Sequence, residues 1–193
     1  ERPPGSDGML QMEPRPDLAV IDDELCIVTA PGSEGTLACT GYTPIGYYGD
    51  PKKSAETFIT LSGRLWVLTG DRARIDVDGQ YVILGRGSQC INSGGEKIYP
   101  EEVEEAARRY AAVGDVQVVG VPDERWGQKV AAVVQVAAGA SFDRTEFDRI
   151  CRNHLSGYKV PKVVCLVDQM QRSPAGKADY TWAKKLAAAQ AGT

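Results

Sequence analysis

The sequence predicts an α+β protein in two parts, a β-rich segment over residues 1–86 and a small α+β domain over residues 89–193. The first part carries several short strand patterns separated by turn residues, with almost no helical periodicity. The second part alternates between strand-like and helix-like patterns. With 193 residues, 42% hydrophobic and 25% charged, the chain has the composition of an ordinary globular protein and enough length to bury a core.

The β-rich segment contains four short strand patterns and one short helix. The strands are predicted at residues 18–21, 25–29, 36–40 and 65–68. A helix is predicted over residues 51–58, because Asp50 suits the N-cap and Pro51 suits the first helical position. No helix in this segment is large enough to cover both faces of a sheet. We therefore expect the segment to be the end of a larger N-terminal domain.

A β-hairpin is predicted after the Thr-Gly-Asp sequence at residues 69–71. Asp78-Gly79 is the residue pair preferred in a two-residue type I′ turn. That turn would place Asp71 opposite Arg86, with their Cβ atoms about 5 Å apart. The residues expected to share their face are Ala73, Ile75, Val77, Val82 and Leu84. The pair is either a salt bridge that closes the hairpin or a clamp for the two adjacent hydroxyls of a ribose.

The second part is predicted to fold as a three-stranded sheet with helices. Strands are expected at residues 116–121, 130–136 and 163–167, and helices at residues 100–110, 143–155 and 179–189. The first helix begins with Pro100 and carries acidic residues in its first turn, both typical of a helix N-terminus. The second begins with Asp143, with Glu146 three residues later, which resembles a capping box.

Charge and composition exclude several functions. The net charge of −4 argues against nucleic acid as a partner, and no apolar run approaches the roughly 20 residues of a transmembrane helix. The chain has one histidine and five widely spaced cysteines, so neither a metal site nor a Ser-His-Asp triad is expected. A cytoplasmic location is predicted, with peripheral membrane association left open.

Five short motifs occur in one order along the chain. They are Gly35-Thr-Leu-Ala38 with Gly46-Tyr-Tyr-Gly-Asp-Pro51, Thr69-Gly-Asp71, Gly85-Arg86 with the run that continues to Glu104, Leu155-Ser-Gly-Tyr-Lys-Val-Pro161, and Arg172-Ser-Pro-Ala-Gly-Lys177. Together they resemble the adenylate-forming superfamily, specifically AMP-forming acyl-CoA ligases. The upstream phosphate loop and adenine motif of that family do not occur. The resemblance implies the C-terminal part of a longer ligase, inactive alone, whose partner is the missing N-terminal part.

The resemblance also implies a reaction and a set of site residues. A carboxylic acid is activated by ATP to an acyl-adenylate, and the acyl group is then transferred to CoA. ATP and CoA are thus expected as substrates, with Mg²⁺ accompanying ATP on ligands outside this sequence. The implied roles are Lys177 in adenylation, Asp71 and Arg86 on the ribose, Gly94 and Gly95 along the CoA channel, and Lys159 and Lys162 on the CoA phosphates.

Two further expectations concern the joint and the substrate. Glycine provides backbone freedom, so the hinge about which the family's small domain rotates is expected at Gly87-Ser88. The sequence from Gly176 to Trp182 is more similar to fatty-acyl or sterol-side-chain ligases than to luciferase or acetate enzymes. Gly-Gly-Glu before Tyr-Pro favours CoA ligases over peptide-synthetase adenylation domains. That second class and a non-catalytic binding or regulatory module of the same fold remain alternatives.

Overall fold

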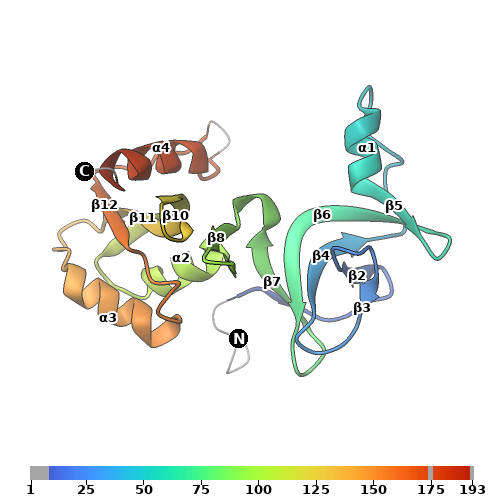
Figure 1. Ribbon diagram of the computed structural model, residues 1–193, viewed down its shortest axis with the longest axis horizontal. Helices are drawn as coiled ribbons and strands as arrows, with labels where there is room; N and C mark the ends of the chain where they lie inside the picture. The colour runs from blue at the N-terminus through green and yellow to red at the C-terminus, as the bar shows by residue number, and fades with distance from the viewer. Residues whose placement is uncertain (1–8, 174–175, 192–193) are drawn as a thin grey trace. The chain divides into compact units, whose positions relative to one another are not determined.

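The computed structural model describes residues 9–173 and 176–191. The chain divides into two compact units, one ending at Ser88 and one beginning at Gln89. The described residues form four α-helices and two mainly antiparallel sheets, one sheet in each unit (Figure 1). The α+β class predicted from the sequence is confirmed.

The described part of the first unit is built on a seven-stranded antiparallel sheet. Its strands are β1 (Gln11–Met12), β2 (Leu18–Ile21), β3 (Ile27–Val28), β4 (Glu34–Cys39), β5 (Phe58–Leu61), β6 (Arg64–Ile75) and β7 (Tyr81–Arg86). They lie in the order β1-β7-β6-β4-β2-β3, and β5 also pairs with β6. The long strand β6 pairs with three others and is the centre of the sheet.

The short helix α1 (Pro51–Thr57) begins as the sequence predicts. The Asp50 carboxylate accepts a hydrogen bond of 2.9 Å from the Lys53 N–H, and Pro51 occupies the first helical position. The helix ends one residue before the predicted end. Phe58 instead begins β5, which is held by its pairing with β6.

The hairpin between β6 and β7 turns through three residues, 77–79, and the prediction of a two-residue type I′ turn is wrong. The Asp76 N–H donates to the Gln80 carbonyl at 2.9 Å, and the Gly79 N–H donates to the Asp76 carbonyl at 3.1 Å. Gly79 adopts φ +81°, as expected for the last residue of a three-residue loop. The longer loop shifts the register of the hairpin by one residue.

A bulge in β7 reverses this shift. Arg72 pairs with Gly85, whereas Ala73 pairs with Ile83, so Leu84 is an extra residue of β7. The longer loop and the bulge therefore offset each other, and Asp71 pairs with Arg86 at the open end of the hairpin, as predicted.

The predicted shared face of the hairpin is correct only in part. Ala73 and Ile75 are buried, but they are opposite Ile83 and Tyr81 rather than residues 84 and 82, and Val77 is exposed at the loop. The buried cluster on this face consists of Val20, Leu37, Ala73, Ile75 and Tyr81. The extra residue of the three-residue loop causes the difference, because it shifts the register between the loop and the bulge by one residue and side chains alternate between faces along a strand.

The second unit contains a five-stranded sheet, not the three-stranded sheet predicted. Its strands are β8 (Ile91–Ser93), β9 (Glu96–Ile98), β10 (Val113–Asp123), β11 (Gly127–Val136) and β12 (Val163–Val167). The last three are the predicted strands, and β12 runs parallel to β11. The hairpin of β8 and β9 is additional. Each of its strands has only three residues, with polar side chains around the Gly-Gly turn, so the sequence carries no clear strand pattern here.

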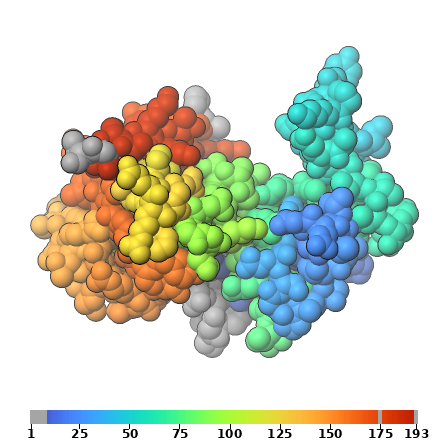
Figure 2. Space-filling view, in the orientation of Figure 1, coloured from blue at the N-terminus to red at the C-terminus, as the bar shows by residue number. Residues whose placement is uncertain are grey.

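Helices cover both faces of this sheet. Helix α2 (Pro100–Arg108) and helix α3 (Arg144–His154) pack on the face that carries Val116 and Val118, whereas α4 (Tyr180–Ala191) packs on the face that carries Val119 and Val121. The Asp143 carboxylate caps α3, as predicted. In Figure 2, α3 (orange) and α4 (red) lie on opposite sides of this unit. The three-layer packing fixes the loops that join these elements.

Candidate functional site

The Thr-Gly-Asp sequence is an irregularity in β6, with three residues opposite Leu37 of β4. The Thr69 hydroxyl donates to the Leu37 carbonyl at 2.9 Å and accepts a hydrogen bond from the Asp71 N–H at 3.2 Å. Gly70, between them, adopts φ +82°, a backbone conformation that favours glycine. The hydroxyl and the glycine thus shape the bulge that determines where Asp71 points.

Asp71 and Arg86 form the predicted pair. They are opposite each other in the register of β6 and β7, and the Arg86 Nε lies 2.9 Å from the Asp71 carboxylate. The side chains are 32% exposed for Asp71 and 62% exposed for Arg86. An ion pair this open contributes little to stability, so stability alone does not explain it. Its use as a ribose clamp stays a prediction.

The predicted joint at Gly87 and Ser88 lies in a short 3₁₀ helix, η1 (Gly87–Gln89). The division into two compact units falls immediately after Ser88. A Cβ atom at Gly87 would meet the Arg72 Cγ at 3.5 Å, which is an ordinary contact. Packing therefore does not require glycine here, and the hinge role stays a prediction.

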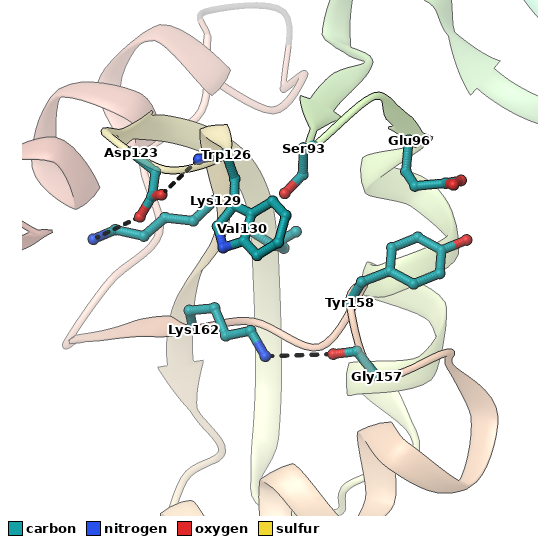
Figure 3. Close-up of a pocket in the computed structure, with 10 residues that line it drawn as sticks. Ser93, Glu96, Asp123, Trp126, Lys129, Val130, Gly157, Tyr158 and Lys162 are labelled. Carbon is teal, nitrogen blue, oxygen red and sulfur yellow. Dashed lines mark hydrogen bonds and ion pairs between the residues drawn. The ribbon is translucent and has the colours of Figure 1, made fainter.

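The second unit contains a pocket of about 570 Å³ at the β8–β9 turn. The predicted Gly94 and Lys162 both line it, together with Trp126, Lys129 and Tyr158. Figure 3 shows the rings of Trp126 and Tyr158 on opposite sides of this pocket, with Lys162 extending along its edge. The volume is within the usual range for a small-molecule site.

Gly94 is in direct contact with Trp126. Its N–H donates to the Trp126 carbonyl at 2.9 Å, and a Cβ atom here would lie 2.7 Å from the ring carbon Cε3. Gly94 also adopts φ +61°. Gly95 has φ +91°, but an added Cβ would meet nothing within 4 Å. The first glycine therefore allows the close approach of backbone and ring, whereas the second serves only the turn.

Sequence reasoning missed Trp126. The residue lies in the tight turn between β10 and β11, where the Asp123 carboxylate accepts hydrogen bonds of 3.0 Å from the N–H groups of Arg125 and Trp126. The side chain is 48% exposed. The available signal was a tryptophan directly before Gly127 and three residues after Asp123, because a large apolar ring on an exposed turn is unusual.

The two predicted lysines are in different environments. Lys162 lines the pocket, and its Nζ donates to the Gly157 carbonyl at 3.4 Å. Lys159 does not line the pocket. Its Nζ lies 2.7 Å from both carboxylate oxygens of Glu102, and its side chain is 18% exposed. The structure therefore brings Lys162, but not Lys159, together with Gly94.

Lys177 lies on a hydrogen-bonded loop between β12 and α4; Pro174 and Ala175 of this loop lie outside the described residues. The Ser173 N–H donates to the Lys177 carbonyl at 2.8 Å, and the Lys177 N–H donates to the Ser173 Oγ at 3.2 Å. The Gly176 N–H donates to the Ser173 carbonyl at 2.8 Å. Lys177 is exposed, and its ammonium forms no ion pair with a described residue. The backbone of Lys177 is thus held by hydrogen bonds to Ser173, while its charge is open to a ligand.

Glu104 is a buried carboxylate close to this loop. Its Oε1 accepts hydrogen bonds from the Val118 N–H at 2.9 Å and from the Tyr180 hydroxyl at 3.1 Å, and its Oε2 pairs with Arg108 at 3.1 Å. Burial raises the pKa of Glu104 despite these partners. Burial, followed by the negative charge of Glu104, raises the pKa of Tyr180. These contacts link α2, β10 and α4.

Among residues 9–173 and 176–191, no group of three or more His, Cys, Asp or Glu side chains is arranged to hold a metal ion. Within the same ranges, no helix is long and apolar enough to cross a membrane.

Comparison with known proteins shows similarity to one group of enzymes. Residues 102–177 match the family described as the AMP-binding enzyme C-terminal domain. The chain is 50% identical over 164 residues to a medium/long-chain-fatty-acid–CoA/3-oxocholest-4-en-26-oate–CoA ligase of Mycobacterium tuberculosis, covering 85% of this chain and 30% of that protein. It is 49% identical over 163 residues to the 3-oxocholest-4-en-26-oate–CoA ligase of Rhodococcus rhodochrous, covering 84% and 29%. The chain thus spans about 30% of the length of these relatives.

Solved structures show the same likeness. The amide bond synthetase McbA from Marinactinospora thermotolerans matches with a TM-score of 0.78 and 30% identity, over 90% of this chain and 35% of that one. The o-succinylbenzoate CoA synthetase MenE from Bacillus subtilis, in complex with its acyl-adenylate intermediate, matches with a TM-score of 0.75 and 26% identity, over 86% and 33%.

Proposed function

Because the chain belongs to the adenylate-forming superfamily and aligns with the C-terminal region of its acyl-CoA ligases, we propose that it supplies that region of an AMP-forming acyl-CoA ligase. In the first half-reaction, a carboxylate oxygen attacks the α-phosphorus of ATP, and the bond to pyrophosphate breaks. In the second, the CoA sulfur attacks the acyl carbon, and AMP leaves. The observation that carries this proposal is that hydrogen bonds between Ser173 and Lys177 hold the Lys177 backbone while its exposed ammonium is open to a ligand.

Lys177 would act in the first half-reaction. The attacking carboxylate and the α-phosphate are both anionic, so their approach is opposed by charge repulsion. An ammonium between their oxygens reduces this repulsion and stabilises the charge of the transition state. No side-chain nucleophile is needed, because the substrate carboxylate itself attacks ATP and the acyl group is carried by the adenylate.

Asp71 and Arg86 would bind the ribose of ATP and of the acyl-adenylate. An ionised carboxylate only accepts hydrogen bonds, so it suits two adjacent hydroxyl donors. The guanidinium of Arg86 holds that carboxylate from one side and offers further donors to the nucleotide. Both side chains are open to solvent, which allows a ligand to reach them.

The pocket beside Gly94 would bind CoA. The rings of Trp126 and Tyr158 offer stacking surfaces for a nucleobase, and the ammonium of Lys162 suits a phosphate group. The backbone at Gly94 and Gly95 carries no side chains, so a narrow pantetheine arm could run along it. CoA combines these three chemical features in one molecule.

The joint at Gly87 and Ser88 would separate the two half-reactions. Rotation of the backbone there would allow the second unit to present Lys177 during adenylation and the Gly94 pocket during transfer to CoA. The compact division immediately after Ser88 supports this assignment.

The acid is proposed to be a fatty acid or a steroid with a carboxylated side chain, the substrates named for the relatives at about 50% identity. A full-length protein containing this sequence should release pyrophosphate from ATP only when such an acid is present, and should then form its CoA thioester. Transfer to an amine, as in an amide bond synthetase, or to a carrier protein, as in a peptide synthetase, would contradict the CoA assignment. Failure to form any adenylate would favour a non-catalytic module.

A further inference from the structure

The segment that precedes Lys177 is attached to the sheet by three polar side chains from neighbouring strands. Asp115 and Gln117 lie on β10, and Gln135 lies on β11 directly opposite Asp115. The neighbouring side chains of this sheet are mostly apolar, so these polar groups need hydrogen-bond partners. Burying a polar group without such a partner costs free energy of folding. Each of the three has its partner in residues 170–172.

These contacts follow one another along the chain. The Gln135 Oε1 accepts from the Met170 N–H at 2.7 Å, the Gln117 Nε2 donates to the Gln171 carbonyl at 3.1 Å, and the Asp115 carboxylate pairs with the Arg172 guanidinium. Gln117 is 1% exposed, so its bond to the backbone is made in the protein interior. Three successive residues are therefore held at defined places on the sheet.

Arg172 connects the sheet to the loop that carries Lys177. Its backbone forms a β-bridge with Ala178, which closes the base of the loop. Its guanidinium also donates to the Gly176 carbonyl at 3.5 Å. Arg172 thus contacts the loop by backbone and side chain and is fixed to β10 through Asp115. On the other side of Lys177, the Tyr180 hydroxyl is held by the buried Glu104.

We propose that Asp115 is a positioning residue for Lys177, acting through Arg172, and this proposal rests on the assignment of Lys177 to adenylation. The Arg172 side chain is 44% exposed, so solvent screens the Asp115–Arg172 pair and limits what the pair contributes to folding. Its effect is to hold the loop in one place on β10. An electrostatic catalyst depends on such preorganisation, since its charge must already be located where the transition state needs it.

The first test measures the two half-reactions in a full-length protein that carries this sequence. Asp115→Asn keeps the size of the side chain and its hydrogen bond from the Val116 N–H, but removes the charge that holds Arg172. Adenylation should fall about tenfold in kcat, with the KM for ATP unchanged, because a small displacement of a catalytic group costs up to ~10²-fold in rate. Transfer from supplied acyl-adenylate to CoA should not change. Asp115→Glu should restore most of the adenylation rate.

A matched control is the ion pair of Arg144 and Asp148 on α3. Its side chains are 43% and 19% exposed, compared with 44% and 21% for Arg172 and Asp115. Asp148→Asn should leave both half-reactions unchanged. Arg172→Gln should resemble Asp115→Asn, and the double variant should be no slower than either single variant, because the two residues act as one unit.

The second test does not depend on activity. In the 193-residue chain, Asp115→Asn should accelerate amide hydrogen exchange at Ser173 and Lys177, whose bonds close the loop. Asp148→Asn should not. Unchanged exchange at these amides in Asp115→Asn would overturn the proposal.

The outcomes separate this inference from the proposed function. If Lys177→Ala leaves adenylation intact, the proposed function itself fails. If Lys177→Ala slows adenylation but Asp115→Asn behaves like Asp148→Asn, only the positioning role fails. Equal losses in both half-reactions, or a large fall in the melting temperature for Asp115→Asn, would show a general structural role and would also overturn it.

Discussion

The Arg86 Nε lies 2.9 Å from the Asp71 carboxylate, although the hairpin that joins the two residues departs twice from its predicted register. The three-residue loop moves the strands by one residue, and the extra residue Leu84 moves them back. Gly70 and Thr69 shape the bulge from which Asp71 projects. The pair is thus defined by backbone irregularities on both strands, and bulges commonly aim side chains at functional sites in this way.

Asp71→Asn should weaken nucleotide binding. An amide accepts hydrogen bonds from ribose hydroxyls less strongly than a carboxylate, and it loses the ion pair with Arg86. We expect the KM for ATP to rise about 10- to 100-fold, the range for loss of a hydrogen bond to a charged group. Steady-state ATP–pyrophosphate exchange measures this.

Asp17 provides the control for that change, since it forms an exposed ion pair with Arg15 in the same unit. Asp17→Asn should leave the KM for ATP unaltered. If Asp71→Asn also leaves it unaltered, the pair is only a salt bridge, and the ribose clamp is wrong.

Gly94→Ala and Gly95→Ala separate backbone strain from contact with Trp126. Both glycines have positive φ, so each substitution should lower stability by about 1–2 kcal/mol. Only Gly94→Ala places a Cβ against the Trp126 ring, so only it should change the tryptophan fluorescence and raise the KM for CoA. Chemical denaturation, emission spectra and thioester kinetics check this. Equal spectral changes in both variants would contradict the close contact.

Lys162 and Lys159 should differ in their effects on CoA. Lys162→Ala removes an ammonium from the pocket and should raise the KM for CoA without altering adenylation. Lys159→Ala breaks the ion pair with Glu102 and should lower the melting temperature while leaving the KM for CoA unchanged. Thioester kinetics with supplied acyl-adenylate compare the two. A larger effect of Lys159 on the KM would restore its predicted role on the CoA phosphates.

Glu104→Gln should change how stability depends on pH. Burial raises the pKa of Glu104 above its ordinary value of 4.5, so the folded state holds the proton more tightly than the unfolded state. The resulting stabilisation is complete below pH 4.5 and is lost as the pH rises through the folded-state pKa. The free energy of unfolding of the unaltered protein, relative to that of Glu104→Gln, should therefore fall as the pH rises above 4.5, and urea denaturation at a series of pH values measures this.

Glu146 gives a control of opposite sign. Its hydrogen bonds with Arg149 lower its pKa, so its contribution is present at neutral pH and is lost as the pH falls. The stability of the unaltered protein relative to Glu146→Gln should decline toward acid pH. If the stability of the unaltered protein relative to Glu104→Gln also declines toward acid pH, the surroundings of the Glu104 carboxylate stabilise its charged form and do not destabilise it.

Strong local signals allowed much of the fold to be predicted. The strands at residues 18–21 and 163–167 have the predicted bounds, and Asp50 and Asp143 cap the helices predicted for them. In these cases the pattern or the capping residue is local, so no distant contact is needed to decide the structure. The β8–β9 hairpin was missed because its stability comes from burial of Ile91 and Ile98 in a core built by other elements.

The candidate site was predictable where a motif lies within one element. Asp71 and Arg86 belong to one hairpin, and their pairing was predicted correctly because the three-residue loop and the extra residue Leu84 shift the register in opposite directions. The Trp126–Gly94 contact joins two turns that are distant in the sequence, and the separation of Lys159 from the pocket depends on its ion pair with Glu102 of α2. Such contacts depend on how the sheet and its helices pack together, and local sequence patterns do not predict that packing.

The most direct test of the central claim is the effect of Lys177→Ala on the two half-reactions in a full-length protein that contains this sequence. Adenylation should fall by about 10²- to 10³-fold, the loss typical of one preorganised electrostatic group. Transfer of a supplied acyl-adenylate to CoA should be nearly unchanged, and the 193-residue chain alone should catalyse neither step. Equal losses in both half-reactions, or pyrophosphate exchange by the 193-residue chain alone, would contradict the account.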